Sequence, residues 1–316
     1  MTQDRPRDKA ALICGSVAYD TILQFPDRFK SHILPDKIHI LNVSFLVPDM
    51  RREFGGCAAN IAYSLKLLGD QGVPMATAGH DFAPYRARME AQGIPLDHVR
   101  VIDDSFTAQA FITTDLDDNQ ITAFHPGAMQ QAHLNQVSDA GSGIALGIVA
   151  PDGRQAMIEH AAQFAAAKIP FIFDPGQGMP MFGAEDLKTF ITQARWVTLN
   201  DYEWELLQQK TGFAVSDVTA QVEALVVTRG AEGSVIYTKG RTLTIPCVRP
   251  TAVVDPTGCG DAYRAGLIHG LLRGLDWETT GRVASLMGAI KIESRGPQNH
   301  SFTQAQFDRR YRDNFG

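Results

Sequence analysis

The 316-residue sequence lacks the features that mark membrane proteins and nucleic-acid-binding proteins. It contains no run of about 18 or more apolar residues, which argues against a membrane-spanning helix. Its formal net charge is −6, so a basic surface for nucleic acid is not expected. With 44% apolar and 20% charged residues, the composition is nevertheless that of a globular protein with a sizeable core. These properties favour a small-molecule partner.

Metal-binding and P-loop motifs are also missing. The four cysteines show no C-x-x-C spacing, which argues against a zinc site or a disulfide framework and favours a reducing cytoplasm. The nine histidines form no H-E-x-x-H motif, and there is no G-x-x-x-x-G-K-[ST] loop. The chain start is polar, and the apolar run after it is too short for the core of a signal peptide. We expect residues 1–10 to form a flexible tail.

Apolar runs alternate with helical patterns through most of residues 11–316, which predicts one α/β domain. Such alternation is typical of a mostly parallel sheet covered by helices on both faces. In these sheets the loops after strand ends carry the site, and here they hold Asp20, Asp174, Asn200, Gly230 and Asp255. The expected strands span 11–14, 75–78, 144–149, 171–173, 196–199 and 225–227, and the expected helices span 154–168, 185–194, 201–210, 261–273 and 277–294.

Two segments, at about 21–54 and 105–126, break this alternation. The first contains Pro26, Pro35 and Pro48 and has no strong helical period. The second has two stretches of alternating polarity around residues 117–120, which predicts a hairpin. We expect both segments to be additions to the sheet domain rather than a separate domain.

The stretch from Asp255 to Asp261 is the most informative motif of the chain. Gly258 and Gly260 lack a Cβ, so the backbone that opens the expected helix can approach a ligand closely. Because the first N–H groups of a helix are unpaired and its N-terminus is positive, Gly258, Cys259 and Gly260 are placed to bind an anion. Asp261 is placed to accept a proton from an attacking hydroxyl, which indicates phosphoryl transfer to an alcohol. Alternatively, Asp261 only stabilises the helix dipole.

A second glycine motif, Gly55-Gly56, is followed by Asn60 at the mouth of another expected helix. A tight turn and a helix cap would explain these residues equally well. Taken together, in this order, the two motifs resemble the signatures of the ribokinase-like (PfkB) carbohydrate and nucleoside kinases. The resemblance implies a ribokinase-like α/β fold, with 21–54 and 105–126 as a small β lid that closes over the acceptor or mediates a homodimer. Closure makes physical sense because water would otherwise hydrolyse the phosphoryl donor.

The same resemblance implies a site for ATP and Mg²⁺. Asn200 and Glu203 match an element that holds Mg²⁺ and the phosphates, largely through water, although Asn200 would serve equally as a helix cap. Thr228, Arg229 and Gly230 match a nucleotide-contacting loop, in which Arg229 reaches a phosphate or faces solvent.

The resemblance further implies a monovalent-cation loop, for K⁺, at Asp255 and Thr257. Pro256 departs here from the threonine that the family often carries. Cys259 also stands at a variable place of the signature, and a thiol at a helix N-terminus can become acidic and oxidisable.

On the acceptor side, Asp20 resembles the aspartate that holds two ribose hydroxyls, with Gly55, Gly56 and Asn60 completing the pocket; alternatively, Asp20 is a turn residue. Residues 33–56, 121–128 and 173–177 resemble the bacterial adenosine and nucleoside kinase branch, and Phe45, Phe111 and Phe124 are candidates for an aromatic shelf under a base. The sequence thus favours an ATP-dependent nucleoside kinase of purine salvage, with a ribokinase or fructokinase and a non-catalytic nucleoside sensor as alternatives.

Overall fold

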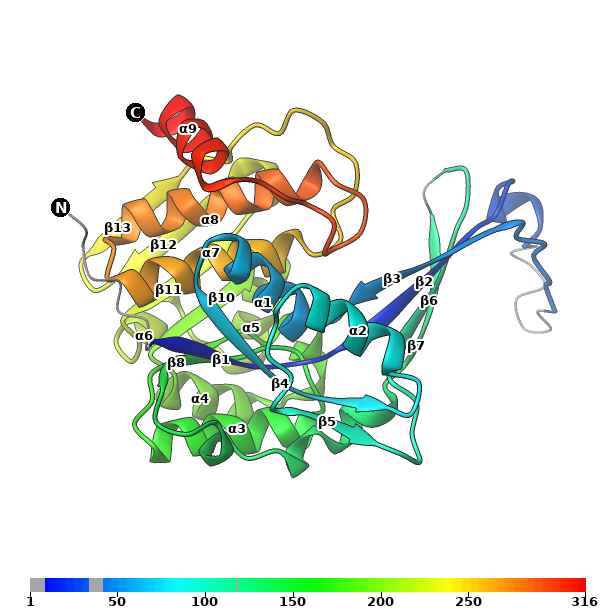
Figure 1. Ribbon diagram of the computed structural model, residues 1–316. Helices are drawn as coiled ribbons and strands as arrows, with labels where there is room; N and C mark the ends of the chain where they lie inside the picture. Colours follow the sequence, from blue (N-terminus) through cyan, green and yellow to red (C-terminus); the bar gives the residue numbers. More distant parts are fainter. Residues whose placement is uncertain (1–8, 34–41, 118) are drawn as a thin grey trace.

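The body of the protein is a nine-stranded sheet in the order β13-β12-β11-β10-β9-β8-β1-β4-β5 (Figure 1). The computed structural model describes residues 9–33, 42–117 and 119–316. Neighbouring strands from β11 to β5 run parallel, whereas β12 and β13 are antiparallel at one edge. The predicted fold class is confirmed. The strands are β1 (Ala10–Cys14), β4 (Gln71–Gly79), β5 (Val99–Ile102), β8 (Ile144–Val149), β9 (Phe171–Phe173), β10 (Trp196–Asn200), β11 (Ala224–Thr228), β12 (Ser234–Thr238) and β13 (Arg241–Ile245).

Both faces of this sheet are covered by helices, so the strands β1, β8 and β9 at its centre carry no polar side chain. Along β1, Ala11 and Ile13 join one buried cluster while Leu12 and Cys14 join the other, because successive side chains point to opposite faces. The helices are α1 (Cys57–Leu67), α2 (Ala83–Ala91), α3 (Arg154–Ala166), α4 (Ala184–Gln193), α5 (Asp201–Thr211), α6 (Val215–Thr219), α7 (Cys259–Arg273), α8 (Trp277–Ile292) and α9 (Gln304–Phe315), with short 3-10 turns at η1 (Phe29–Ser31), η3 (Gly127–Leu134), η4 (Val137–Ala140), η5 (Gly176–Met181) and η6 (Gly230–Glu232).

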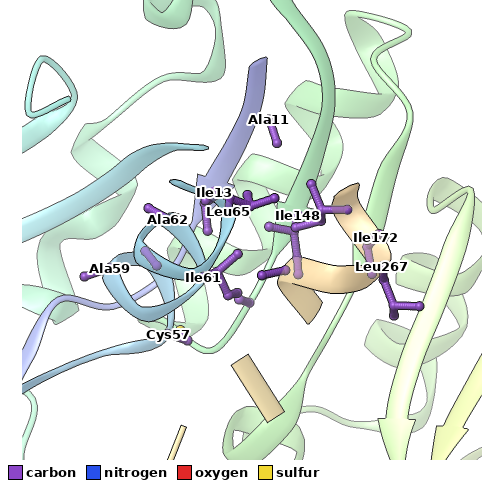
Figure 2. Packing of buried hydrophobic residues seen from close by; sticks show 14 of the residues in the cluster. Ala11, Ile13, Cys57, Ala59, Ile61, Ala62, Leu65, Ile148, Ile172 and Leu267 are labelled. Atoms are coloured by element: carbon purple, nitrogen blue, oxygen red, sulfur yellow. The ribbon is translucent and has the colours of Figure 1, made fainter. Parts of the chain in front are cut away.

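The core on the α1 and α7 side holds helix α7, which begins at Cys259 directly after Gly258. Figure 2 shows the apolar side chains of this cluster, which come from both the strands and the helices. Full burial of each large aliphatic side chain contributes about 1.5–3 kcal/mol relative to exposure. This packing therefore holds the start of α7 rigidly above the sheet. The contributing residues include Ile13, Ile148 and Ile172 from the strands and Ile61, Leu65 and Leu267 from the helices.

Helices α7 and α8 lie unusually close to each other because glycines line their contact. A Cβ added at Gly266 would lie 2.4 Å from the Cα of Ala284. One added at Gly270 would lie 2.3 Å from the Oγ1 of Thr280. The close approach brings the C-terminal end of α8 beside the loop that leads into α7, which is the loop of the Asp255 to Asp261 motif.

A second, four-stranded sheet projects from the body and contains both segments predicted to form a lid (Figure 1). Its order is β3-β2-β6-β7. The predicted hairpin is present, because β6 and β7 pair antiparallel. The strands are β2 (Ala18–Gln24), β3 (Asp49–Gly55), β6 (Ala108–Thr114) and β7 (Gln120–His125). The lid sheet therefore begins at Ala18, earlier than the predicted 21.

Several predicted boundaries need correction. Ala10 was assigned to the tail, but it is buried and opens β1. Helix α7 begins at Cys259 rather than Asp261, because the turn at Gly258 already directs the chain into the helix. Residues 1–8 of the predicted tail, Pro35 of the lid and Asp118 of the hairpin lie outside the described residues. No helix in the described part combines the length and apolarity needed to cross a bilayer.

Candidate active site

The turn before α7 exposes backbone amides, as the glycine motif predicts. Gly258 has φ +80°, and a Cβ there would lie 2.7 Å from the Cβ of Pro297, so both conformation and space require glycine. Among the described residues, the N–H groups of Gly258, Gly260 and Asp261 have no acceptor within the protein. Cys259 corrects the prediction, because its N–H donates to Pro256 O at 3.1 Å within the turn. The cradle for an anion thus has free donors on either side of Cys259.

The Cys259 thiol is also less acidic than its place at a helix N-terminus suggests. Desolvation raises the pKa of Cys259 to about 11, and the positive charge of Lys291 offsets only part of this effect. The nearby carboxylates of Asp255 and Asp261 raise the pKa further. Because the thiolate is the reactive form, the structure gives no support to an acidified thiol here.

Asp261 lies in the first turn of α7, where the Asn60 side-chain amide donates to its Oδ2 at 2.8 Å. Desolvation raises the pKa of Asp261 to about 7, although the hydrogen bond from Asn60 lowers it. The negative charge of Asp174 raises the pKa as well. A carboxyl group with a pKa near neutrality is well suited to act as a general base at the pH of a cell.

Asn60 is held by a hydrogen-bonded chain that the sequence did not predict. Its Oδ1 accepts from the Gln298 side-chain amide at 2.9 Å, and the same amide nitrogen lies 2.6 Å from the Tyr85 hydroxyl. Tyr85 in turn donates to Gly55 O at 2.6 Å. The chain ties the two glycine motifs together and orients the Asn60 amide, so that its N–H points at Asp261. Gln298 and Tyr85 stand outside any local motif, and sequence alone carried no signal for them.

Asp20 lies within lid strand β2, not in a loop after a body strand as predicted. Its carboxylate crosses the backbone of Gly55, where an added Cβ would lie 2.5 Å from the Asp20 Oδ2. Desolvation raises the pKa of Asp20 to about 6, with smaller contributions from the charges of Asp255 and Glu53. Among the described residues, none donates a hydrogen bond to the Asp20 carboxylate, so its oxygens are open to a ligand.

Gly56 is required by the turn that carries the chain from the lid into α1. It has φ +90°, and a Cβ would lie 2.6 Å from both Ser16 O and Ala18 N. Glycine therefore permits the close contact between the start of α1 and the connection from β1 to β2. The contact places Asn60 one helical turn beyond Gly56, facing Asp261.

The lid face that carries Asp20 also carries Phe124. Asp20 pairs with Ala110, and Ala110 pairs with Phe124, so the three residues form one row across β2, β6 and β7. Between them lies the small, buried Ala110, and the ring of Phe124 at the end of the row is half-exposed. The other two predicted shelf residues lie elsewhere, because Phe111 faces the opposite side of the lid and Phe45 packs on Phe25, 4.7 Å between ring centroids.

Asn200 and Thr228 end neighbouring parallel strands in register, at the edge of the sheet where the site is expected. Asn200 caps α5, accepting from the Glu203 N–H at 2.7 Å, while the Glu203 carboxylate accepts from the Asn200 backbone N–H at 2.8 Å. Glu203 is buried, and desolvation followed by the charge of Asp174 raises its pKa. The interpretation of Asn200 as a helix cap is thus confirmed. Glu203, which completes the cap, lies close enough to Asp174 to feel its negative charge.

The loop after β11 is open to solvent. Arg229 is exposed, with its guanidinium 3.4 Å from the Tyr237 hydroxyl, and Gly230 follows it with φ +53°. Thr228 donates its hydroxyl to Leu199 O at 3.3 Å. The predicted nucleotide residues therefore share one edge of the sheet with Asn200, and Arg229 is free to reach a ligand there.

A buried ion pair supports the floor of the site. The Arg264 guanidinium donates two hydrogen bonds to Asp174, at 2.9 and 3.0 Å, and both side chains are almost fully buried. Arg264 stands three residues after Asp261 in α7, so it lies on the same helix face. That three-residue spacing could have pointed to Arg264 as a site residue, but the sequence analysis named only Asp174, in the loop after its strand. Because removal of one buried partner leaves a bare charge, the pair also fixes α7 to the loop after β9.

The predicted metal residues do not form a direct coordination cage. Among the described residues, no cluster of three or more His, Cys, Asp or Glu side chains is arranged to hold a metal ion. Asn200 and Glu203 also satisfy each other through their capping contacts. The negative charge of Asp174 nonetheless acts on both Glu203 and Asp261, so a hard cation that keeps its water ligands would be attracted here without direct coordination.

Comparisons with known proteins agree with this geometry. The sequence pattern of the pfkB family carbohydrate kinases matches residues 30–304. A nucleoside kinase from Methanocaldococcus jannaschii is 32% identical over 82% of this chain and 85% of its own length. A solved nucleoside kinase from Burkholderia thailandensis, in complex with inosine, is 51% identical, with a TM-score of 0.88 over 97% of this chain and 98% of that one. The same kinase in complex with ADP-inosine is 52% identical, with a TM-score of 0.86 over 97% of this chain and 96% of that one.

The family match spans far more than half of the residues, and it includes both glycine motifs and the helix that carries Asp261. The resemblance predicted from those motifs is therefore confirmed. The chain belongs to the pfkB family of carbohydrate kinases, and it is a phosphotransferase with an alcohol group as acceptor.

Proposed function

We propose that the protein is an ATP- and Mg²⁺-dependent kinase that phosphorylates the 5′-hydroxyl of a ribonucleoside. The observation that carries the proposal is the meeting of three elements: the Asp261 carboxyl, the free amides of Gly258 and Gly260, and the lid face with Asp20. The two solved structures of the Burkholderia thailandensis kinase, both with inosine, support a nucleoside acceptor, and the one with ADP-inosine supports an adenine nucleotide as the donor.

On the acceptor side, the Asp20 carboxylate accepts hydrogen bonds from the two ribose hydroxyls. The base then extends along the row toward Ala110 and Phe124, which is about two strand spacings, or roughly 9–10 Å, from Asp20. Such a distance suits a nucleoside better than a free pentose, because the sugar alone would leave Phe124 without a partner. The ring of Phe124 offers a stacking surface for the base.

In the chemical step, Asp261 takes the proton from the 5′-hydroxyl as its oxygen attacks the γ-phosphorus of ATP. The new P–O bond forms as the bond to the leaving ADP breaks, so the products are a nucleoside monophosphate, ADP and one proton. The amides of Gly258 and Gly260 donate hydrogen bonds to the transferred group, whose oxygens carry the charge. Asn60 holds the Asp261 carboxylate in place at 2.8 Å throughout.

On the donor side, Asn200, Thr228, Arg229 and Gly230 line the sheet edge where the nucleotide binds. Arg229 supplies a positive charge to a phosphate. Bound Mg²⁺ would neutralise phosphate charge, and Glu203 would hold it through water, since its own oxygens already accept from Asn200.

A single assay separates this function from its alternatives. ADP release is measured with ATP and Mg²⁺ and a panel of adenosine, inosine, guanosine, cytidine, ribose and fructose. Nucleoside-dependent turnover supports the proposal, whereas turnover with free sugars alone would identify a ribokinase or fructokinase. Binding of a nucleoside without ADP release would identify a sensor.

The role of Asp261 is tested with a matched pair of variants. Asp261→Asn keeps the size of the side chain, removes the base and should lower kcat by roughly two to four orders of magnitude. Glu278→Gln removes an acidic residue from the first turn of α8, far from the site, and should leave kcat unchanged. Comparable losses in both would show that Asp261 acts only on a helix dipole.

We also propose that the lid mediates a homodimer and that the enzyme works in the cytoplasm, where ATP is available. The lid face opposite Asp20 exposes large apolar side chains, including Met50, Phe111 and Ile121, which a second lid would cover. Sedimentation velocity should give the mass of a dimer for the wild type, and Ile121→Lys should shift it toward a monomer. A wild-type monomer at micromolar concentration would contradict the lid dimer.

A further inference from the structure

Lys291 is a buried cation that the mechanism does not use. It lies in the last turn of α8 and is 0% exposed. Its ammonium group donates to Asp255 O at 2.8 Å and to Ser294 O at 3.1 Å. Desolvation lowers the pKa of Lys291, while the negative charges of Asp255 and Glu53 raise it. Its direct partners are thus backbone carbonyls rather than a carboxylate.

The two carbonyls belong to the two loops that meet under the start of α7. The Asp255 carboxylate accepts from Thr257 N at 2.9 Å and from Gly296 N at 2.8 Å. Ile292 O, at the end of α8, accepts from Asp255 N at 3.1 Å. These bonds and the ammonium of Lys291 close the turn that leads into Gly258, so the position of the anion cradle depends on them.

The same loop is where the family resemblance implies a monovalent cation at Asp255 and Thr257. A bound K⁺ replaces its water shell with carbonyl oxygens, and here two such oxygens already accept from the Lys291 ammonium. The Asp255 carboxylate is satisfied by two amides as well. A second unit charge within a few ångströms of the ammonium would be repelled by it. The residues present therefore do not fit a K⁺ ion.

We propose that Lys291 is a tethered substitute for the monovalent cation, and that the ammonium positions the α7 turn without K⁺. The proposal rests on the proposed kinase function for its activity assay, but not for its stability assay. Lys291 is a positioning residue, since it contacts the loop and not the reacting groups. A tethered charge has the advantage that no separate ion must be captured and ordered.

The first test uses the wild-type enzyme and needs no variant. Initial rates are measured in K⁺-free buffer with added potassium chloride or, at equal ionic strength, tetramethylammonium chloride. We expect the two rates to differ by less than about twofold. Activation by K⁺ of about tenfold or more would overturn the proposal. The melting temperature of the wild type should likewise be the same in both salts, because a cation that does not bind cannot stabilise the fold.

The second test removes the ammonium. Lys291→Ala leaves space and two unpaired carbonyls, so kcat should fall roughly tenfold or more and recover in K⁺ or ammonium salts. The melting temperature of the variant should rise in the same salts. A folded Lys291→Ala enzyme with full activity in K⁺-free buffer, or one insensitive to every cation, would overturn the proposal. If the variant does not fold, the wild-type salt series still decides.

Lys210 provides the matched control. Its ammonium also donates only to backbone carbonyls, those of Met179, Pro180 and Phe182, but these lie away from the α7 turn. Lys210→Ala should lose stability without any change in the response of kcat to K⁺. If no panel nucleoside is phosphorylated, the proposed function fails, while the two melting-temperature series still test Lys291.

Discussion

Asn60 should set the pH at which the enzyme becomes active, because it donates the hydrogen bond that holds down the pKa of Asp261. In the wild type this pKa is raised to about 7, so kcat/KM should rise with pH up to about that value as the base loses its proton. A second break near pH 6 is expected from Asp20, whose raised pKa is about 6. Below this break, both carboxyl groups must ionise and the slope of log kcat/KM should steepen.

Asn60→Leu keeps the approximate shape of the side chain and removes its 2.8 Å hydrogen bond to the Asp261 carboxylate. A hydrogen bond to a charged group contributes about 1.5–3 kcal/mol, which corresponds to roughly 1–2 pKa units. Loss of the bond disfavours the ionised form, so the upper break should move from about 7 to about 8–9. At neutral pH only about a tenth or less of the variant would then carry an ionised base.

The assay is the kcat/KM profile for the nucleoside from acid to alkaline pH, since this ratio reports the free enzyme. Asn60→Leu should recover much of its loss at high pH, whereas a loss of substrate contacts alone would be the same at every pH. Asp20→Asn is the control, because it should weaken nucleoside binding and remove the lower break. Since the negative charge of Asp20 helps to raise the pKa of Asp261, this variant should move the upper break slightly downward, opposite to the shift in Asn60→Leu. An upper break that stays in place in Asn60→Leu would refute the reasoning.

Two further predictions concern stability. Gly56→Ala should lower the free energy of unfolding by roughly 3 kcal/mol or more, because the added Cβ would meet backbone atoms at 2.6 Å. Gly69→Ala, at a similar positive φ but with open space around the added Cβ, should lower it by about 1 kcal/mol. Equal costs in urea titrations would contradict this. Asp152 is buried, and desolvation raises its pKa to about 8, so the folded state binds an extra proton between about pH 4 and 8. The free energy of unfolding should therefore fall as pH rises through that interval, by up to about 1.4 kcal/mol per pH unit. Urea denaturation at several pH values should show a smaller fall for Asp152→Asn than for the wild type. The same pH dependence in both proteins would show that Asp152 is not its source.

Local sequence patterns predicted six of the nine strands of the body sheet, most helix positions and the glycine motifs, but not β5, β12 or β13. These features follow from local patterns: buried parallel strands need continuous apolar runs, and a turn with positive φ, such as that of Gly258, needs glycine. The hairpin of the lid likewise follows from alternating residues around a polar turn. For the same reason the two signatures were visible without any knowledge of packing.

The partners of the site residues follow from the packing of elements that are distant in the chain. Asn60 donates to an aspartate 201 positions away, and Gln298 reaches Asn60 from 238 positions away. Lys291 reads in the sequence as an ordinary residue near the end of a helix, until the close packing of α7 and α8 directs its ammonium to the carbonyls under the cradle. Such contacts depend on how elements pack and in which register, and no local pattern of residues encodes them. The pKa values of the site depend on the same packing, because burial and neighbouring charges are properties of the folded chain.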